Sequence, residues 1–406
     1  MKIRLLTAVI GLTLAGASTV GLAGAAPVAG PPGTPTLRPE AAVGAEVAVG
    51  PGVAVGPALA VGPDWRKVAH PATEATLRDV VALSGTDAWS VGERQPPQAT
   101  GTPLAEHWDG TSWTAVPVPP TPTGAGELDG IAATSANDVW AVGDSSGQGP
   151  VIRHWNGTSW TTVAPAPPPG TEHPGADRLY DVTVAPTGQA WAVGLYSNWN
   201  NPGPATLIEA WDGTSWTRVP TPSPGRTGNS LQSTAAISAT DAWAVGWYTG
   251  DQANVALALH WDGHAWTRSP MPLPAGNTEL EGVTAVAADD VWAVGTNEGH
   301  PLAVHWNGTR WNALPSPLVT SAWLQSVTPA QNGDVWAAGY QMTDDGTVSR
   351  PLFLRWDGNR WTTGTTEEPE GAVYALTRSD SSTWAVGTTS PCSCFVAPPL
   401  VEVTGP

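Results

Sequence analysis

The sequence predicts an all-β protein: a seven-bladed β-propeller whose blades each hold four antiparallel strands. Three patterns predict it, and each recurs at a period of about fifty residues. Trp-Ala-Val-Gly, with small variations, occurs seven times. Trp-(Asp/Asn)-Gly-x-x-Trp follows each of the first six copies. A short apolar run that opens with leucine lies twelve residues before the first tryptophan in six copies.

Each repeat reads as four strands, A to D, in chain order. The A strands open at six leucines, Leu77, Leu128, Leu179, Leu231, Leu280 and Leu324, with a less regular seventh copy at 372–374. The B strands carry the Trp-Ala-Val-Gly tryptophans, Trp89, Trp140, Trp191, Trp243, Trp292, Trp336 and Trp384. The C and D strands form a tight hairpin, because an Asp-Gly or Asn-Gly pair between β-prone residues favours a two-residue turn. No helix-length pattern interrupts them.

The two ends of the repeat region complete one blade together. The seventh unit ends at 400–403, which aligns with a C strand and leaves its D strand missing. Residues 64–68 match the D-strand segment 112–116, so we expect an N-terminal strand to complete the last blade. The propeller is therefore predicted to span residues 64–406.

The first 63 residues lie outside the predicted propeller and indicate that the protein is exported. Residues 1–25 combine a basic start, an apolar stretch and a small-residue end, which is typical of a secretory signal peptide. An uncleaved anchor is the less favoured alternative. Residues 26–63 are mostly Ala, Gly, Pro and Val and read as a flexible spacer. We expect a secreted, extracellular protein with no membrane insertion after cleavage.

The net charge and the two cysteines limit which classes of partner and metal we expect this protein to bind. The net charge of −18 becomes −20 once cleavage removes Lys2 and Arg4. So acidic a chain disfavours nucleic acid as a partner. The two cysteines, Cys392 and Cys394, could form a strained local disulfide but cannot make a zinc site alone. A closed ring needs no partner for stability, so a monomer is expected.

The repeated residues predict packing, not chemistry. A tryptophan at one place in every blade fits burial between neighbouring blades. The histidines before four C-strand tryptophans have Ala210, Arg355 and Val403 as counterparts, so no metal or proton chemistry requires them. The aspartates that precede most Trp-Ala-Val-Gly copies read as turn residues that bind backbone. We therefore predict no catalytic residue and no metal ligand among them.

Candidate ligand-binding residues lie where the repeat varies. Six of the aromatic side chains outside the repeated positions are placed in loops on the face that carries the B-to-C and D-to-A connections, with local packing as the alternative. They are Trp199, Trp247, Trp323, Tyr196, Tyr248 and Tyr340.

A second set follows each A-strand leucine and differs from blade to blade, so we expect it to surround the mouth of the central channel. It comprises Arg78, Asp129, Tyr180, Gln232, Glu281 and Gln325. Four acids could together attract Ca²⁺, although no fixed-spacing loop requires it. They are Asp79, Asp129, Asp181 and Glu281. No other cofactor is expected.

The repeats resemble those of secreted bacterial propeller proteins, loosely linked to kelch and galactose-oxidase-like propellers and to Asp-box propellers. That resemblance implies a seven-bladed ring and little about activity. The kelch double glycine, a galactose-oxidase-like copper site and the Ser of the Asp box are missing. We therefore expect a non-catalytic scaffold that binds a glycan, peptide or protein on the variable-loop face. The alternative is an extracellular hydrolase or lyase that uses acids and Tyr180 at the channel mouth.

Overall fold

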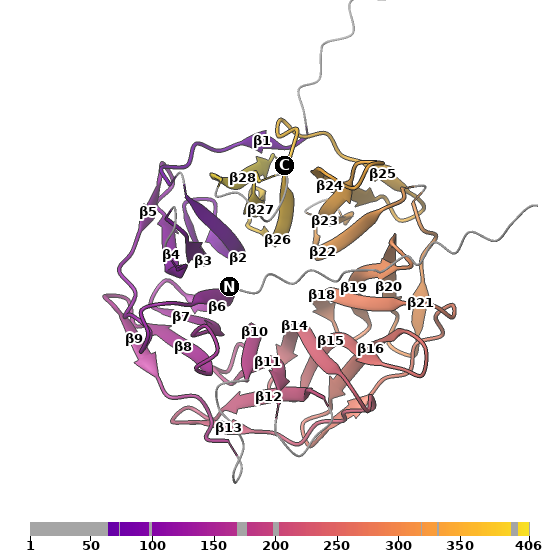
Figure 1. The fold of residues 1–406 in the computed structure, drawn as a ribbon, viewed down its shortest axis with the longest axis horizontal. Helices are drawn as coiled ribbons and strands as arrows, with labels where there is room; N and C mark the ends of the chain where they lie inside the picture. The colour runs from indigo at the N-terminus through magenta and orange to yellow at the C-terminus, as the bar shows by residue number, and fades with distance from the viewer. Residues whose placement is uncertain are drawn as a thin grey trace, which may run out of the picture. The chain divides into compact units, whose positions relative to one another are not determined.

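The chain forms the predicted ring. A computed structural model describes residues 64–72, 74–96, 100–168, 177–197, 203–317, 319–330, 333–390 and 397–405. They form seven four-stranded antiparallel sheets arranged around a central axis (Figure 1). The all-β, seven-bladed prediction is confirmed. The signal peptide, the spacer, Cys392 and Cys394 lie outside the described residues. Within the described residues, no helix is long and apolar enough to cross a membrane.

In each blade the innermost strand contains the short apolar run, and the second strand contains Trp-Ala-Val-Gly. The strands nearest the axis are β2 (Ala75–Ser84), β6 (Glu127–Ser135), β10 (Arg178–Val184), β14 (Asn229–Ser238), β18 (Thr278–Ala287), β22 (Ala322–Pro329) and β26 (Ala372–Arg378). The second strands are β3 (Asp87–Arg94), β7 (Asp138–Asp144), β11 (Ala190–Tyr196), β15 (Asp241–Thr249), β19 (Asp290–Asn297), β23 (Val335–Met342) and β27 (Thr383–Thr388).

The two outer strands form the hairpin that contains the Asp-Gly or Asn-Gly pair. The third strands are β4 (Thr102–Trp108), β8 (Pro150–Trp155), β12 (Ala205–Trp211), β16 (Asn254–Trp261), β20 (His300–Trp306), β24 (Ser349–Trp356) and β28 (Pro399–Thr404). The outermost strands are β5 (Trp113–Ala115), β9 (Trp160–Val163), β13 (Trp216–Arg218), β17 (Trp266–Arg268), β21 (Trp311–Ala313), β25 (Trp361–Thr363) and β1 (Arg66–Lys67).

The N-terminal strand closes the ring as predicted. β1 pairs with β28 in the register Arg66↔Val403 and Lys67↔Glu402 (Figure 1). Trp65, fully buried, stacks on Phe353 of the preceding blade with ring centroids 4.3 Å apart. The first described strand is therefore held both by its own sheet and by its neighbour.

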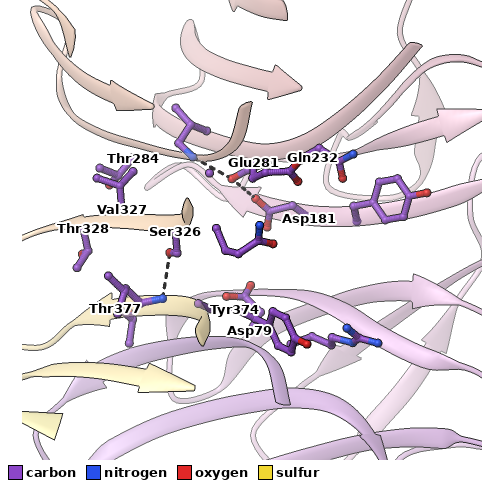
Figure 2. A pocket seen from close by; sticks show the side chains of 18 of the residues that line it. Asp79, Asp181, Gln232, Glu281, Thr284, Ser326, Val327, Thr328, Tyr374 and Thr377 are labelled. Carbon is purple, nitrogen blue, oxygen red and sulfur yellow. Dashed lines mark hydrogen bonds between the residues drawn. The ribbon is translucent and has the colours of Figure 1, made fainter. Parts of the chain in front are cut away.

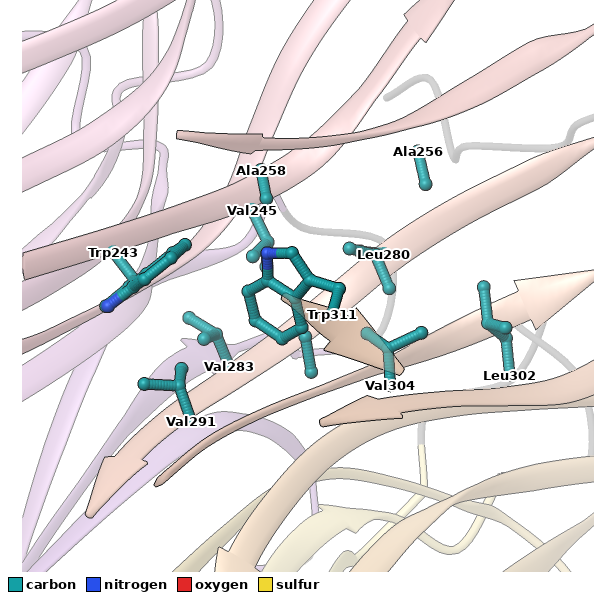
Figure 3. Packing of buried hydrophobic residues seen from close by; sticks show 11 residues of the cluster. Trp243, Val245, Ala256, Ala258, Leu280, Val283, Val291, Leu302, Val304 and Trp311 are labelled. Atoms are coloured by element: carbon teal, nitrogen blue, oxygen red, sulfur yellow. The ribbon is translucent and has the colours of Figure 1, made fainter. Parts of the chain in front are cut away.

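A layer of tryptophans joins each blade to the next. Figure 3 shows one such interface, where Trp243 of β15 meets Trp311 of β21 at 88° with ring centroids 5.2 Å apart. The layer also holds Val245 and Leu280, both fully buried. Edge-to-face contact of two large rings combines wide apolar burial with favourable quadrupole geometry. The packing interpretation of the repeated tryptophans is consistent with this layer.

The aspartates before Trp-Ala-Val-Gly do something other than the predicted turn binding. The Asp241 carboxylate lies 2.8 Å from Nε2 of His260, and that imidazole stacks on Trp243 with centroids 4.3 Å apart. Three more blades contain the same Asp-His pair, at 2.7 to 2.8 Å. In the sixth blade Arg355 takes the place of histidine beside Asp334. In four blades the aspartate thus contacts a histidine that lies over the buried tryptophan.

Candidate functional site

A β-bulge interrupts every innermost strand at the same place. The register between first and second strands skips one residue in each of the seven blades. A bulged residue leaves the ladder, and its side chain is re-aimed. The skipped residues are Arg78, Asp129, Tyr180, Gln232, Glu281, Gln325 and Tyr374. We call these seven the bulge ring.

The close crossing of the two inner strands explains why Trp-Ala-Val-Gly ends in glycine. At Gly246 an added Cβ would lie 2.1 Å from the backbone oxygen of Ser230 and 2.8 Å from Cα of Leu231. The same clash would occur at the matching glycine of every other blade. Glycine therefore permits the inner strand to lie close enough for the bulge to form beside it.

The bulge ring surrounds one cavity of about 250 Å³ (Figure 2). All seven side chains line it, and all are half-buried. Six of them are the residues that the sequence placed at the channel mouth. The seventh, Tyr374, was missed because its blade has one residue fewer between the bulge and the following tryptophan, Trp384.

On one side of the mouth the side chains form a charged network. Arg78 Nη2 lies 3.1 Å from Glu127 of the next blade and 3.4 Å from Glu93 of its own. Its guanidinium carbon also lies 5.4 Å from the centre of the Tyr374 ring. Arg78 is therefore held between two carboxylates and an aromatic face.

One layer below the bulge ring, polar side chains bind the backbone of the next blade. Asp79 Oδ2 accepts a 2.8 Å hydrogen bond from the N–H of Ile131, and Asp181 Oδ2 accepts one of the same length from Thr234. The other carboxylate oxygens accept bonds from Val80 and Val182. Serines at this position act alike, with Ser326 accepting the N–H of Leu376 at 3.0 Å. We call this the latch layer.

Burial changes the acidity of the latch carboxyls. Burial raises the pKa of Asp181 to about 6, although its hydrogen bonds oppose the shift. Burial also raises the pKa of Asp79 well above its usual range, and repulsion from Asp181 adds to it. Within the described residues, no group of three or more His, Cys, Asp or Glu side chains could hold a metal ion. Ca²⁺ binding stays a prediction.

The off-repeat aromatic residues lie in strands, so their placement in loops was wrong for those described. Trp323 belongs to β22, Tyr340 to β23, and both Trp247 and Tyr248 to β15, while Tyr196 ends β11. The first and second strands of a blade continue to pair past the repeated residues, and this pairing includes the aromatic residues. Examples are the pairs Trp323↔Tyr340 and Asn229↔Tyr248. Trp199 lies outside the described residues.

Two kinds of contact hold these aromatic side chains. Trp323 and Tyr340 stack with centroids 5.4 Å apart at 19°. Burial raises the pKa of Tyr340, and repulsion from Tyr374 and Glu281 adds to the shift. Tyr248 instead accepts a 2.8 Å hydrogen bond from Arg268, which also lies over its ring. Tyr196 lies under Arg218 in the same manner.

Comparison with known proteins supports the fold alone. No family model matches the sequence, and no curated protein matches it. Among solved structures, a YCF48 protein bound to D1 peptide is 17% identical, with 86% of this chain and 98% of that chain covered at a TM-score of 0.56. Virginiamycin B lyase from Staphylococcus aureus is 14% identical, with 84% and 98% covered at 0.58.

The WD40 β-propeller domain of Doa1 is a third similar structure, 12% identical, with 84% of this chain and 96% of that chain covered at a TM-score of 0.55. At such identities the common feature is the propeller ring. The kelch-like and galactose-oxidase-like resemblance stays a prediction. These neighbours include a peptide-bound protein and an enzyme, so fold similarity does not choose between binding and catalysis.

Proposed function

We propose that this protein is a non-catalytic binding scaffold that holds its ligand at the mouth of the central channel. One observation carries the proposal: seven equivalent β-bulges direct seven side chains, of five residue types, into one cavity. A position that served packing would repeat its residue, as the tryptophans do. Residues that vary on a fixed scaffold suit recognition of one asymmetric ligand.

The position of the bulges joins this cavity to the variable-loop face. Each bulge lies near the start of an inner strand, and D-to-A connections enter the ring at that face. Near the start of the same inner strand as Gln325, Trp323 stacks on Tyr340 and offers a further aromatic surface. A glycan, a peptide or a protein loop could each use such an edge, and YCF48 shows a propeller of similar fold bound to a peptide. We place this function outside the cell because residues 1–25 read as a signal peptide.

The alternative is a hydrolase or lyase at the same mouth, and two of the four acids that line the cavity are poorly placed to serve it. A general acid or base needs an oxygen free to reach substrate. Both oxygens of Asp79 and both of Asp181 already accept hydrogen bonds from backbone N–H groups. We therefore assign these two acids to blade-to-blade latching.

A ligand screen with matched variants tests the proposal. The protein is applied to arrays of random peptides, glycans and cell-wall polysaccharides, alongside a mouth variant carrying Gln232→Ala, Gln325→Ala and Tyr374→Ala. We expect the mouth variant to lose at least about tenfold in affinity for whatever the wild type binds. A rim variant, Trp247→Ala with Trp323→Ala, serves as the comparison.

Two results would contradict the proposal. Binding that survives in the mouth variant but disappears in the rim variant would move the site to the outer aromatic residues. Conversion of an array ligand into a cleaved product by the wild type, detected by mass spectrometry, would establish catalysis instead. Thermal unfolding of each variant checks that the ring is intact.

A further inference from the structure

The cavity is not centred on the axis. Three adjacent inner strands, β18, β22 and β26, each contribute four consecutive lining residues, whereas each other blade contributes only one or two. The four-residue walls are 281–284, 325–328 and 374–377. The empty space is therefore a slot that runs down one side of the channel.

The walls of this slot are polar along their depth. Glu281, Gln325 and Tyr374 belong to the bulge ring, and Thr284, Thr328 and Thr377 end the three walls. Figure 2 shows Glu281 and Tyr374 separated from these three threonines along the cavity. Hydroxyl, amide and carboxylate oxygens all accept hydrogen bonds. None of the twelve residues of these three walls is lysine or arginine. The slot thus presents a series of oxygen acceptors to anything that enters it.

The electrostatic sign of the cavity is negative. Asp129 and Glu281 line it at the level of the bulge ring, against one basic side chain, Arg78. The latch acids Asp79 and Asp181 also line it, but burial raises the pKa of both and so reduces their charge. The charge of Arg78 is itself compensated by Glu93 and Glu127. Acidic walls inside a low-dielectric ring concentrate the field at the entrance. A positively charged group is favoured there, and an anion is repelled.

The size of the cavity limits what can enter. About 250 Å³ is below the roughly 300–1,000 Å³ usual for pockets that enclose a whole small-molecule ligand. One extended side chain fits better than a folded or branched molecule. The ring of Tyr180 in the lining also suits a cation, which is attracted to the negative face of a ring, whereas the ring of Tyr374 already lies under Arg78.

We propose that the slot binds one protonated ammonium or guanidinium group at the end of a linear chain, inserted along β18, β22 and β26 with Glu281 as its principal counter-charge. The inference rests on the proposed function, because it assigns a ligand class to the same channel mouth. Such a group belongs to a lysine or arginine side chain of a peptide or to a free polyamine. Both sources share the chemistry, and the experiment separates them.

Isothermal titration calorimetry of the full mature chain tests this assignment. The probes are a capped pentapeptide with one central lysine, the same peptide with that lysine acetylated, and spermidine. We expect the lysine peptide or spermidine to bind, with the stronger of the two identifying the source. Glu281→Gln keeps the shape and removes the charge, so it should weaken binding at least about tenfold.

A control variant separates local from overall charge. Asp289→Asn removes one negative charge from the same blade, at the exposed turn between β18 and β19 and away from the cavity. We expect its affinity to match the wild type. If Glu281→Gln and Asp289→Asn weaken binding equally, the attraction is a property of net charge and the assignment is wrong.

The remaining outcomes distinguish this inference from the proposed function. Equal binding of the lysine and acetyl-lysine peptides, or binding of CaCl₂ with no binding of any amine, would overturn the cation assignment. If the mouth variant loses an uncharged array ligand, the binding function stands and the ligand class is wrong. If mouth substitutions change no binding at all, both proposals fail.

Discussion

The tryptophan layer and the bulge ring are built from the same seven repeats, yet they obey opposite rules. Between blades, the same residue types recur at each interface, as in the perpendicular pairs Trp243–Trp311 and Trp89–Trp160. Around the channel, seven equivalent positions hold arginine, aspartate, glutamate, glutamine and tyrosine. A side chain enclosed between two sheets must fit the shape of both, because protein interiors are closely packed. A side chain that faces a cavity is not constrained in this way. The difference separates positions whose residue the fold requires from positions at which the fold permits variation.

The largest expected effect comes from breaking the tryptophan layer. Trp243→Ala should lower the free energy of unfolding by about 3–5 kcal/mol, because it leaves a cavity between two blades where a 1% exposed ring was packed. Chemical denaturation measures the change. Trp323→Ala, half-buried and outside the repeat, is the control and should cost clearly less. Equal losses would mean that the repeated position has no special place in stability.

The latch layer should show an intermediate effect that depends on pH. The pKa of Asp181 is about 6 in the fold, above its usual value of 3.8, so its stabilising contribution is complete below about pH 4 and is lost as pH rises through 6. Hydrogen bonds within their turns lower the pKa values of Asp109 and Asp212 to about 2. Their stabilising contribution is therefore lost as pH falls toward 2.

Stability should therefore be greatest near pH 4–5 and decline by about 1–3 kcal/mol toward pH 8. Thermal unfolding across this range gives the profile. Asp181→Asn removes the titrating group, so the slope between pH 5 and 7 should flatten even though the variant is less stable. An unchanged slope would assign the pH dependence to other buried acids, such as Glu209, whose pKa burial raises to about 7.

The smallest effect is expected in the bulge ring itself. Gln325→Ala should change the free energy of unfolding by less than about 0.5 kcal/mol, because the side chain faces the cavity and is not enclosed between sheets. Urea denaturation at neutral pH is sensitive enough to detect a larger loss. A cost above about 1 kcal/mol would show that bulge residues are also part of the packing, and the comparison would weaken.

The fold could be predicted from sequence because packing between blades repeats its residues. The seven Trp-Ala-Val-Gly copies, the hairpin pattern and the match of 64–68 to 112–116 led to the correct architecture, including the closing strand. What the sequence could not supply was the partner of an individual polar side chain. Asp241, for example, was assigned to a turn but holds His260 across two strands.

The bulges are visible in the sequence as a break in the alternation of apolar and polar residues. Buried residues in the inner strands lie three apart, as at Leu77 and Val80 or Val373 and Leu376, instead of the two apart that a regular strand requires. That spacing marks one extra residue. Applied to the seventh blade, it would have identified Tyr374. The aromatic residues were misplaced for a related reason, because strand pairing continued beyond the repeat.

The pairing of β1 with β28 also affects how the ring can be made. During synthesis the closing strand leaves the ribosome before any other strand of the propeller, yet its partner, Pro399–Thr404, leaves last. Six blades can therefore assemble in order while Trp65 waits without its sheet, and the final blade forms in one late step. A nascent chain stalled before that step would leave one edge of β27 unpaired and β1 without its sheet, and an exposed strand edge of this kind favours aggregation.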